Sequence, residues 1–269
     1  MRGLERFVQL GKSMSNRNFV AVLACAVAAC QPSASADATP APPANSRARP
    51  ARDAQLPPAQ RFERDMMVRF HMLASYDTTR TIERLLIRGQ LDEARYFAQS
   101  LATEADVPGT APWARQIEHV REAAAAVATA PDIAEACRRA ARLADACASC
   151  HRDAGAQAEF QPPHNAPPDL PTVVARMARH RWATERLREG MIGDTEDAWR
   201  AGLDILASEP LAALGSDRKA LAARLQQLAD QARHLPRPTP ADRASVYGEL
   251  LVTCASCHVG PARASGLAR

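Results

Sequence analysis

Five residues that could hold a prosthetic group occur twice in this chain, in the same order. They are Cys147-Ala148-Ser149-Cys150-His151 and Cys254-Ala255-Ser256-Cys257-His258. In a helix, with about 100° of rotation per residue, the two cysteines and the histidine of each pentad face the same way. Two thiols and an imidazole at this spacing are the attachment signature of a c-type haem, in which thioether bonds hold the porphyrin and the imidazole ligates the iron. The sequence therefore predicts two covalently bound haem c groups, attached at Cys147, Cys150, Cys254 and Cys257, with His151 and His258 as iron ligands.

Two other readings of a C-x-x-C pair are less consistent with this sequence. A zinc ribbon brings its two cysteine pairs within about 15–20 residues of each other, whereas these pairs begin 107 residues apart. A thioredoxin-like redox dithiol requires a βαβ setting, and no strand pattern surrounds either pair. Haem attachment is the interpretation that both copies of the pentad favour.

Composition limits the class of protein. The chain has 269 residues, of which 46% are hydrophobic and 24% charged, which is ordinary for globular proteins and leaves room for two domains of about 100 residues. The net charge of +4 is not gathered into a basic stripe, so no nucleic-acid partner is expected. Of the seven cysteines, four belong to the pentads and two to the N-terminal segment. Cys137 remains, and we expect it to be a small buried side chain.

The N-terminal segment predicts export. An apolar run over residues 19–30 follows Arg17; it is too short to span a bilayer and is typical of a signal peptide, assigned to residues 1–30. Its end, Val27-Ala28-Ala29-Cys30, resembles a bacterial lipobox, which implies cleavage before Cys30 and a lipid anchor on that thiol. An earlier match to the lipobox pattern ends at Cys25. A plain secretory signal peptide without a lipid anchor is the alternative. Met14 is an alternative first residue of the translated chain. The expected location is the bacterial periplasm, with a lipoprotein anchor in a membrane.

The remainder of the chain shows helical periodicity, interrupted at two places. Residues 31–60 are rich in Pro, Ala and Ser and predict an extended tether. Helical patterns then fill a first domain, 61–153, and a second, 171–260, separated by a Pro- and Gly-rich linker, 154–170. The tail 261–269 is expected to be disordered. Eight helices are predicted, four in each domain. Those of the first domain cover residues 61–88, residues 91–105, a segment that starts at 113, and a segment from 132 into the first pentad. Those of the second domain cover residues 171–192, a segment from its N-cap Asp194 to 208, residues 216–234, and a segment from its N-cap Thr239 into the second pentad.

The two domains align as copies. Four positions on the first helix of each domain match at an offset of 105 residues, and a leucine stands four residues before the first cysteine of each pentad. This similarity indicates a duplication within one all-α chain. The matched pairs are Met72 and Met177, Thr79 and Thr184, Ile82 and Leu187, Leu86 and Met191, and Leu143 and Leu250.

A helical domain of about 100 residues with C-x-x-C-H on its last helix resembles the class II cytochromes c, the cytochrome c′ family. The resemblance covers residues 61–153 and 171–260. It implies two tandem four-helix bundles, each with a haem c on its last helix.

In low-spin members of that class a methionine on the first helix is the second iron ligand, which here implies Met72 and Met177. His71 and His180 are competing donors, and both methionines could instead be core residues. His119, His164 and His234 are expected at the surface.

Three functions follow from these expectations. The first is a non-enzymatic cytochrome that transfers electrons between periplasmic redox proteins. The second is cytochrome c′-like binding of a diatomic gas, nitric oxide or carbon monoxide, at a five-coordinate haem. The third is a dihaem peroxidase-type enzyme, which would need an acid/base group beside an open iron; His180 could serve in one domain only. Electron transfer without catalysis is the prediction that the sequence favours.

Overall fold

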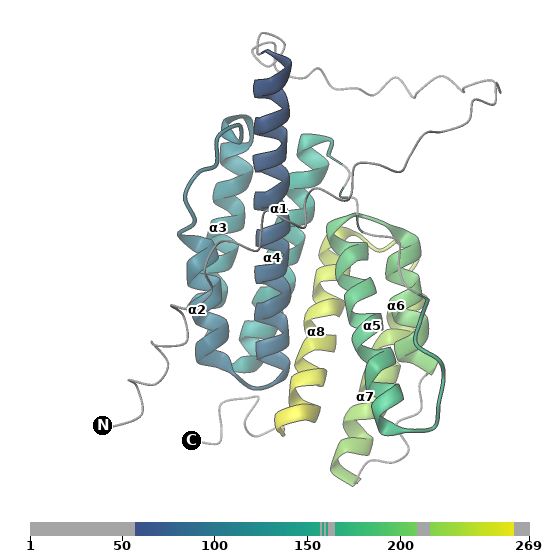
Figure 1. Ribbon diagram of the computed structural model, residues 1–269. Helices are drawn as coiled ribbons and strands as arrows, with labels where there is room; N and C mark the ends of the chain where they lie inside the picture. Colours follow the sequence, from purple (N-terminus) through teal and green to yellow (C-terminus); the bar gives the residue numbers. More distant parts are fainter. Residues whose placement is uncertain (1–56, 157, 159, 161–164, 209–215, 261–269) are drawn as a thin grey trace, which may run out of the picture. The chain divides into compact units, whose positions relative to one another are not determined.

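The computed structural model describes residues 57–156, 158, 160, 165–208 and 216–260, and this part of the chain is all-helical (Figure 1). The first half contains α1 (Pro58–Ile87), α2 (Leu91–Ala102), the short 3-10 helix η2 (Ala111–Trp113), α3 (Ala114–Ala128) and α4 (Ile133–Ala154). The second half contains α5 (Val173–Ile192), α6 (Glu196–Ser208), α7 (Ser216–Arg233) and α8 (Pro240–Val259). The prediction of an all-α fold is therefore confirmed.

Several expectations fall on parts of the chain that are not described. The signal peptide 1–30 with Cys25 and Cys30, nearly all of the tether 31–60, His164 and the tail 261–269 lie outside the described residues. Helix boundaries agree with the predictions to within a few residues elsewhere. The first helix begins at Pro58, inside the segment predicted as tether, because proline is well tolerated in a first helical turn.

Local sequence signals explain where the pentad helices begin. The Asp132 side chain accepts a hydrogen bond from the Glu135 amide at 2.8 Å, which caps α4. At α8, Thr239 and Asp242 form a reciprocal capping box, and Pro240 occupies the first helical position. The expectation that Asp194 caps the sixth helix is wrong. Asp194 lies in the preceding turn with a φ of 50°, and its carboxylate accepts a hydrogen bond from Arg243 instead.

The described apolar side chains form one core that extends through both halves. Consecutive helices pack together within each half, and α4 also packs along α8. The two pentad helices approach closely where α8 has glycine: a Cβ added to Gly248 would lie 3.2 Å from the Cα of Arg138 and 3.5 Å from the Cβ of Ala141. Small residues at this crossing therefore allow the two helices to share a core.

The contacts between the halves follow an approximate two-fold relation. Ala141 and Gly248, which meet at the α4–α8 crossing, are equivalent positions of the repeat. The packing of α1 on α8 has its counterpart in the packing of α4 on α5. Between α1 and α5, Glu83 pairs with Arg188 and Arg80 pairs with Glu185, each pair 105 residues apart. Repeat-equivalent residues therefore contact one another, as equivalent residues do near the axis of a symmetric dimer.

None of the helices in the described part of the chain combines the length and the hydropathy that a membrane span requires.

Candidate haem sites at the ends of α4 and α8

Both pentads occupy the last two turns of their helices, as predicted. Cys147–His151 precedes the end of α4 at Ala154, and Cys254–His258 precedes the end of α8 at Val259. The first cysteine of each pentad packs against the shared core, whereas Cys150 and Cys257 lie further toward the surface. All four thiols are free of disulfides. Each pentad therefore presents two thiols and one imidazole from a single helix end.

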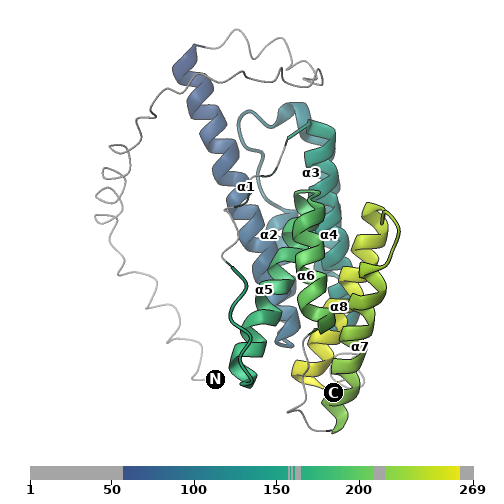
Figure 2. The ribbon, with the colours of Figure 1, turned by 90° about the vertical axis from the view of Figure 1, so that its right-hand side faces the viewer.

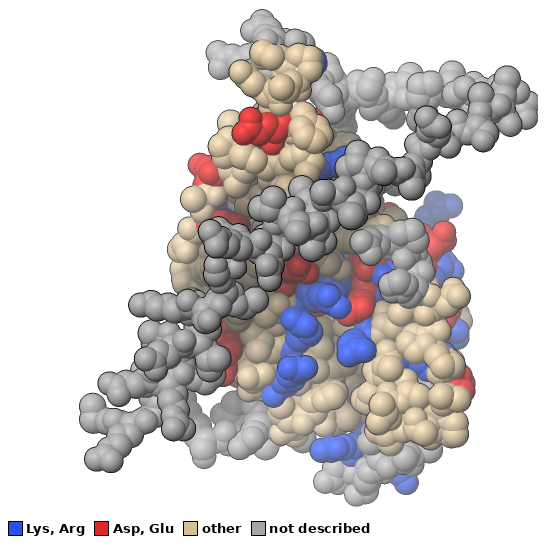
Figure 3. Space-filling model, viewed as in Figure 1, with Lys and Arg blue, Asp and Glu red and all other residues tan. Residues whose placement is uncertain are grey.

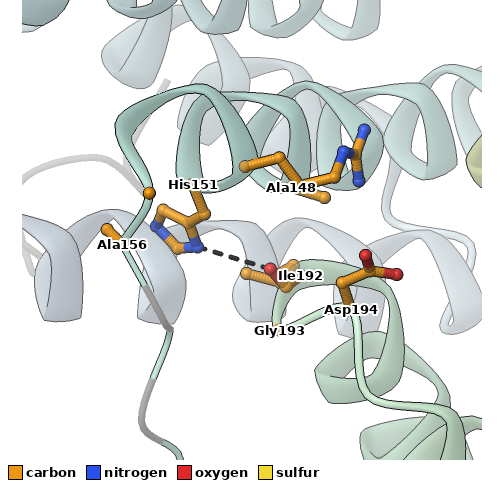
Figure 4. A pocket seen from close by; sticks show the side chains of 8 residues that line it. Ala148, His151, Ala156, Ile192, Gly193 and Asp194 are labelled. Carbon is orange, nitrogen blue, oxygen red and sulfur yellow. Dashed lines mark hydrogen bonds between the residues drawn. The ribbon is translucent and has the colours of Figure 1, made fainter. Parts of the chain in front are cut away.

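The imidazole of His151 is oriented by the second half of the chain. Its Nδ1 lies 3.3 Å from the carbonyl oxygen of Ile192, the last residue of α5 (Figure 4). A carbonyl can only accept, so this contact assigns the proton to Nδ1 and leaves the Nε2 lone pair available. Histidine ligands of metals are commonly held in this way, by a hydrogen bond from the other ring nitrogen. The geometry at His151 thus fits an iron ligand.

A small hollow adjoins His151. Its volume is about 190 Å³, and its walls include the small residues Ala148, Gly155, Ala156 and Gly193 (Figure 4). This is below the range of about 300–1,000 Å³ that is usual for small-molecule pockets, so a porphyrin held at Cys147 and Cys150 would lie partly outside the hollow. Burial lowers the pKa of His151, and the bond to Ile192 opposes that effect only in part. The imidazole is therefore neutral at pH 7, the form that binds a metal.

Charged side chains near this hollow are arranged in pairs. Arg152 Nη2 lies 3.5 Å from Asp145 Oδ1. Arg243 Nη2 lies 2.5 Å from Glu196 Oε2, and Arg243 Nη1 lies 3.4 Å from Asp194 Oδ1. At this end of the molecule each of these arginines thus has an acidic partner.

The second pentad has different surroundings. His258 is exposed, and it lies near the turn that follows α1: a Cβ added to Gly89 would come within 2.4 Å of Val259 Cγ1. Burial, followed by the charges of Arg218 and Arg88, lowers the pKa of His258. Among the described residues no group hydrogen-bonds His258 in the way that Ile192 holds His151. The two pentads therefore share a sequence but not an environment.

The four candidate distal ligands lie on the expected helices. Met72 and His71 are on α1, and Met177 and His180 are on α5; all four are partly buried. α1 runs antiparallel to α4, so its N-terminal part lies at the end of α4 that carries the pentad (Figures 1 and 2). His71 Nδ1 lies 3.3 Å from Oε1 of Glu104, in the loop that follows α2. The choice of distal ligand stays a prediction.

The thiols differ from those of a redox dithiol. Burial raises the pKa of both Cys147 and Cys254 to about 12, and it also raises the pKa of Cys150 and Cys257. Reactive dithiols have a lowered pKa in a basic or helix N-terminal setting, whereas these pentads lie at helix C-termini. Cys137 is fully buried, as predicted, and burial raises its pKa as well.

The remaining site predictions have simple outcomes. The His119 and His234 side chains are 62% and 68% exposed, which confirms their expected place at the surface. No group of three or more His, Cys, Asp or Glu side chains within the described residues is arranged to hold a metal ion. A haem iron takes its equatorial ligands from the porphyrin, so a haem site needs no such group.

Comparisons of this chain with known protein families, with curated proteins and with solved structures give no match. The resemblance to class II cytochromes c therefore depends on the two pentads and their position on the last helix of each repeat.

Two features near the sites were not predicted. One is the contact from His151 to Ile192, which requires the end of α5 to lie beside the end of α4. The other is a buried polar cluster between the halves, where the Glu83 carboxylate accepts hydrogen bonds from Arg188 at 2.5 Å and from the Tyr247 hydroxyl at 2.9 Å. Glu83 and Arg188 are 105 residues apart, which is the same offset that aligns the first helices of the two halves. This equivalence is the one sequence signal that could have indicated the contact.

Proposed function

We propose that this chain is a dihaem c-type cytochrome that carries electrons between redox proteins of the bacterial periplasm. The proposal includes two four-helix bundles, α1–α4 and α5–α8, each holding one haem c at its last helix. The observation that carries it is the pair of C-x-x-C-H pentads at equivalent helix ends, with the imidazole of His151 turned so that Nε2 is available for iron. Localisation and the lipid on Cys30 belong to the same proposal and depend on the sequence alone.

The residues have distinct tasks. Cys147 and Cys150 would bind one porphyrin and Cys254 and Cys257 the other, so that neither haem can dissociate. When bound, a haem iron supplies one-electron redox chemistry. His151 provides a neutral ligand whose orientation is fixed by the Ile192 carbonyl. The shared core between α4 and α8 keeps the two helix ends at a constant separation.

The separation of the sites can be estimated from the helices. α4 and α8 cross where Ala141 meets Gly248, and each first cysteine lies six residues beyond the crossing. The two helices run in opposite directions (Figure 1). With a rise of about 1.5 Å per residue, Cys147 and Cys254 are separated by about 18 Å along the helix axes. The haems would therefore lie at opposite ends of the α4–α8 pair, where each can meet a different partner.

Haem content is the direct test. The full chain should be expressed in a host that exports it and attaches haem, and then examined by intact mass and by the spectrum of the pyridine haemochrome. We expect two haems in the natural protein, and one in either Cys147→Ser/Cys150→Ser or Cys254→Ser/Cys257→Ser. Colourless protein, or protein that binds zinc in place of haem, would contradict the proposal.

The same samples test the distal ligand and the kind of function. If Met72 and Met177 ligate iron, both ferric haems are low-spin, and the ferrous protein does not bind carbon monoxide. Met72→Ala should then convert one haem to high spin, and Met177→Ala the other. A natural protein whose haems are high-spin and bind carbon monoxide would instead indicate gas binding.

A further inference from the structure

The end of α8 carries a group of exposed basic side chains beside the second pentad. They come from the last turn of α1 and its C-cap and from the first turn of α7. The turn after α1 contacts Val259, the residue after His258, at Gly89, and α7 packs on α8. Figure 3 shows basic side chains in a column that runs from the middle of the view down toward the lower end of α1. The members of this group, the basic rim, are Arg84, Arg88, Arg218 and Lys219.

The charges of the basic rim are not neutralised within the described part of the chain. None of its four members forms an ion pair with a described acidic side chain, and the one hydrogen bond from Arg84 goes to the Thr81 hydroxyl. At the end of the molecule with His151, by contrast, three arginines are paired with acids. These pairs are Arg152 with Asp145, Arg121 with Asp106, and Arg243 with Asp194 and Glu196.

Helix stability explains only part of the basic rim. Arg84 and Arg88 lie at the C-terminal end of α1, where positive charge is favourable. Arg218 and Lys219 are the third and fourth residues of α7, at an N-terminal end where positive charge is unfavourable. Their presence there costs stability, so a role outside the fold is the better explanation.

We propose that the basic rim is the docking surface for an acidic redox protein, which exchanges electrons with the haem held at His258. This inference depends on the proposed function, because it needs a haem at the second pentad. In the exchange a ferrous haem loses one electron and becomes ferric, while the oxidised partner gains that electron. Unpaired cations around an exposed redox site attract an acidic partner, speed its encounter and orient it.

The test compares two double variants with the same change in net charge. Arg88→Gln/Arg218→Gln removes half of the basic rim. Arg61→Gln/Arg115→Gln, the control, removes two exposed arginines at the starts of α1 and α3, neither of which has an ion pair with a described residue. Reduced holoprotein is mixed in stopped flow with hexacyanoferrate(III), an anionic one-electron oxidant, and separately with the cationic tris(phenanthroline)cobalt(III). Poly-L-glutamate serves as a competing acidic polymer.

We expect the rim variant to lose about three- to tenfold in the rate with hexacyanoferrate(III) at low ionic strength, and to gain in the rate with the cobalt complex. The differences should fade as salt screens the charges. Poly-L-glutamate should slow the natural protein and the control variant more than the rim variant. Equal losses in the two variants, or rates independent of salt, would overturn the docking surface while leaving the dihaem assignment intact. Protein without haem would overturn the proposed function itself.

Discussion

The two halves of the described chain follow the same plan but differ where they use polar side chains. Equivalent core positions are filled alike: Ile82 and Leu187 are fully buried, and Leu143 and Leu250 nearly so. Elsewhere the halves diverge. Tyr247 on α8 is fully buried, and its equivalent on α4 is Ala140. Duplicated helices thus keep their apolar packing, while single positions acquire charge and hydrogen-bonding groups.

The charges between α1 and α5 show what this divergence permits. At two pairs of equivalent positions one half has glutamate where the other has arginine. The glutamate and arginine of each pair attract each other between α1 and α5. If both halves had kept the same residue, like charges would face each other in the core. A fused pair can therefore use complementary charges that two identical subunits could not.

The largest expected effect comes from breaking the buried pair. The Glu83 and Arg188 side chains are each 3% exposed, and although burial disfavours a charged Arg188, the Glu83 carboxylate raises its pKa. Arg188→Met should lower the free energy of unfolding by about 3 to 5 kcal/mol, because it leaves a buried carboxylate without its cation. Urea unfolding of the purified full chain, followed by circular dichroism, measures this loss.

Two controls identify its cause. Arg80→Met breaks the equivalent pair with Glu185, in which the side chains are 38% and 28% exposed, and should cost no more than about 1 kcal/mol. Glu83→Gln added to Arg188→Met removes the stranded charge and should restore most of the stability. Similar losses in Arg188→Met and Arg80→Met would show that burial does not distinguish the two pairs.

A smaller effect is expected from Tyr247, which has no counterpart in α4. Burial, followed by the nearby Glu83 carboxylate, raises the pKa of Tyr247 well above its usual value of 10. An unfolded tyrosine ionises near pH 10, while the folded protein keeps the proton. The stability from this group is therefore complete below pH 10, and it falls by about 1.4 kcal/mol per pH unit as the pH rises beyond 10.

Tyr247→Phe should flatten this alkaline loss, as measured by urea unfolding between pH 9 and 11.5. Tyr96→Phe is the matched control, because Tyr96 is 71% exposed and lies on the surface of α2. An equal alkaline loss in the natural protein and in Tyr247→Phe would show that another group controls this pH range.

These comparisons show which features could be read from the sequence. Helical periodicity predicted the eight described α-helices, although not the short η2 and not the correct cap of α6, and the pentads predicted the ends of α4 and α8. Periodicity identifies the face of a helix that is buried, but it does not identify what covers that face. The α4–α8 crossing, the contact of His151 with the end of α5 and the basic rim all depend on how the halves pack, so they required the structure. Glu83 and Arg188 look like ordinary surface residues until that packing joins them.

The smallest expected effect compares the caps of the two pentad helices and tests whether the halves unfold together. Asp132→Ala removes the bond to the Glu135 amide, and Thr239→Ala removes one side of the capping box. Each should lower stability by about 1 kcal/mol, with Thr239→Ser as a control that keeps the cap. Because one core joins the halves, either variant should shift a single transition, with circular dichroism and tryptophan fluorescence giving the same midpoint. If Thr239→Ala shifts only part of the signal, the two halves unfold separately despite their shared core.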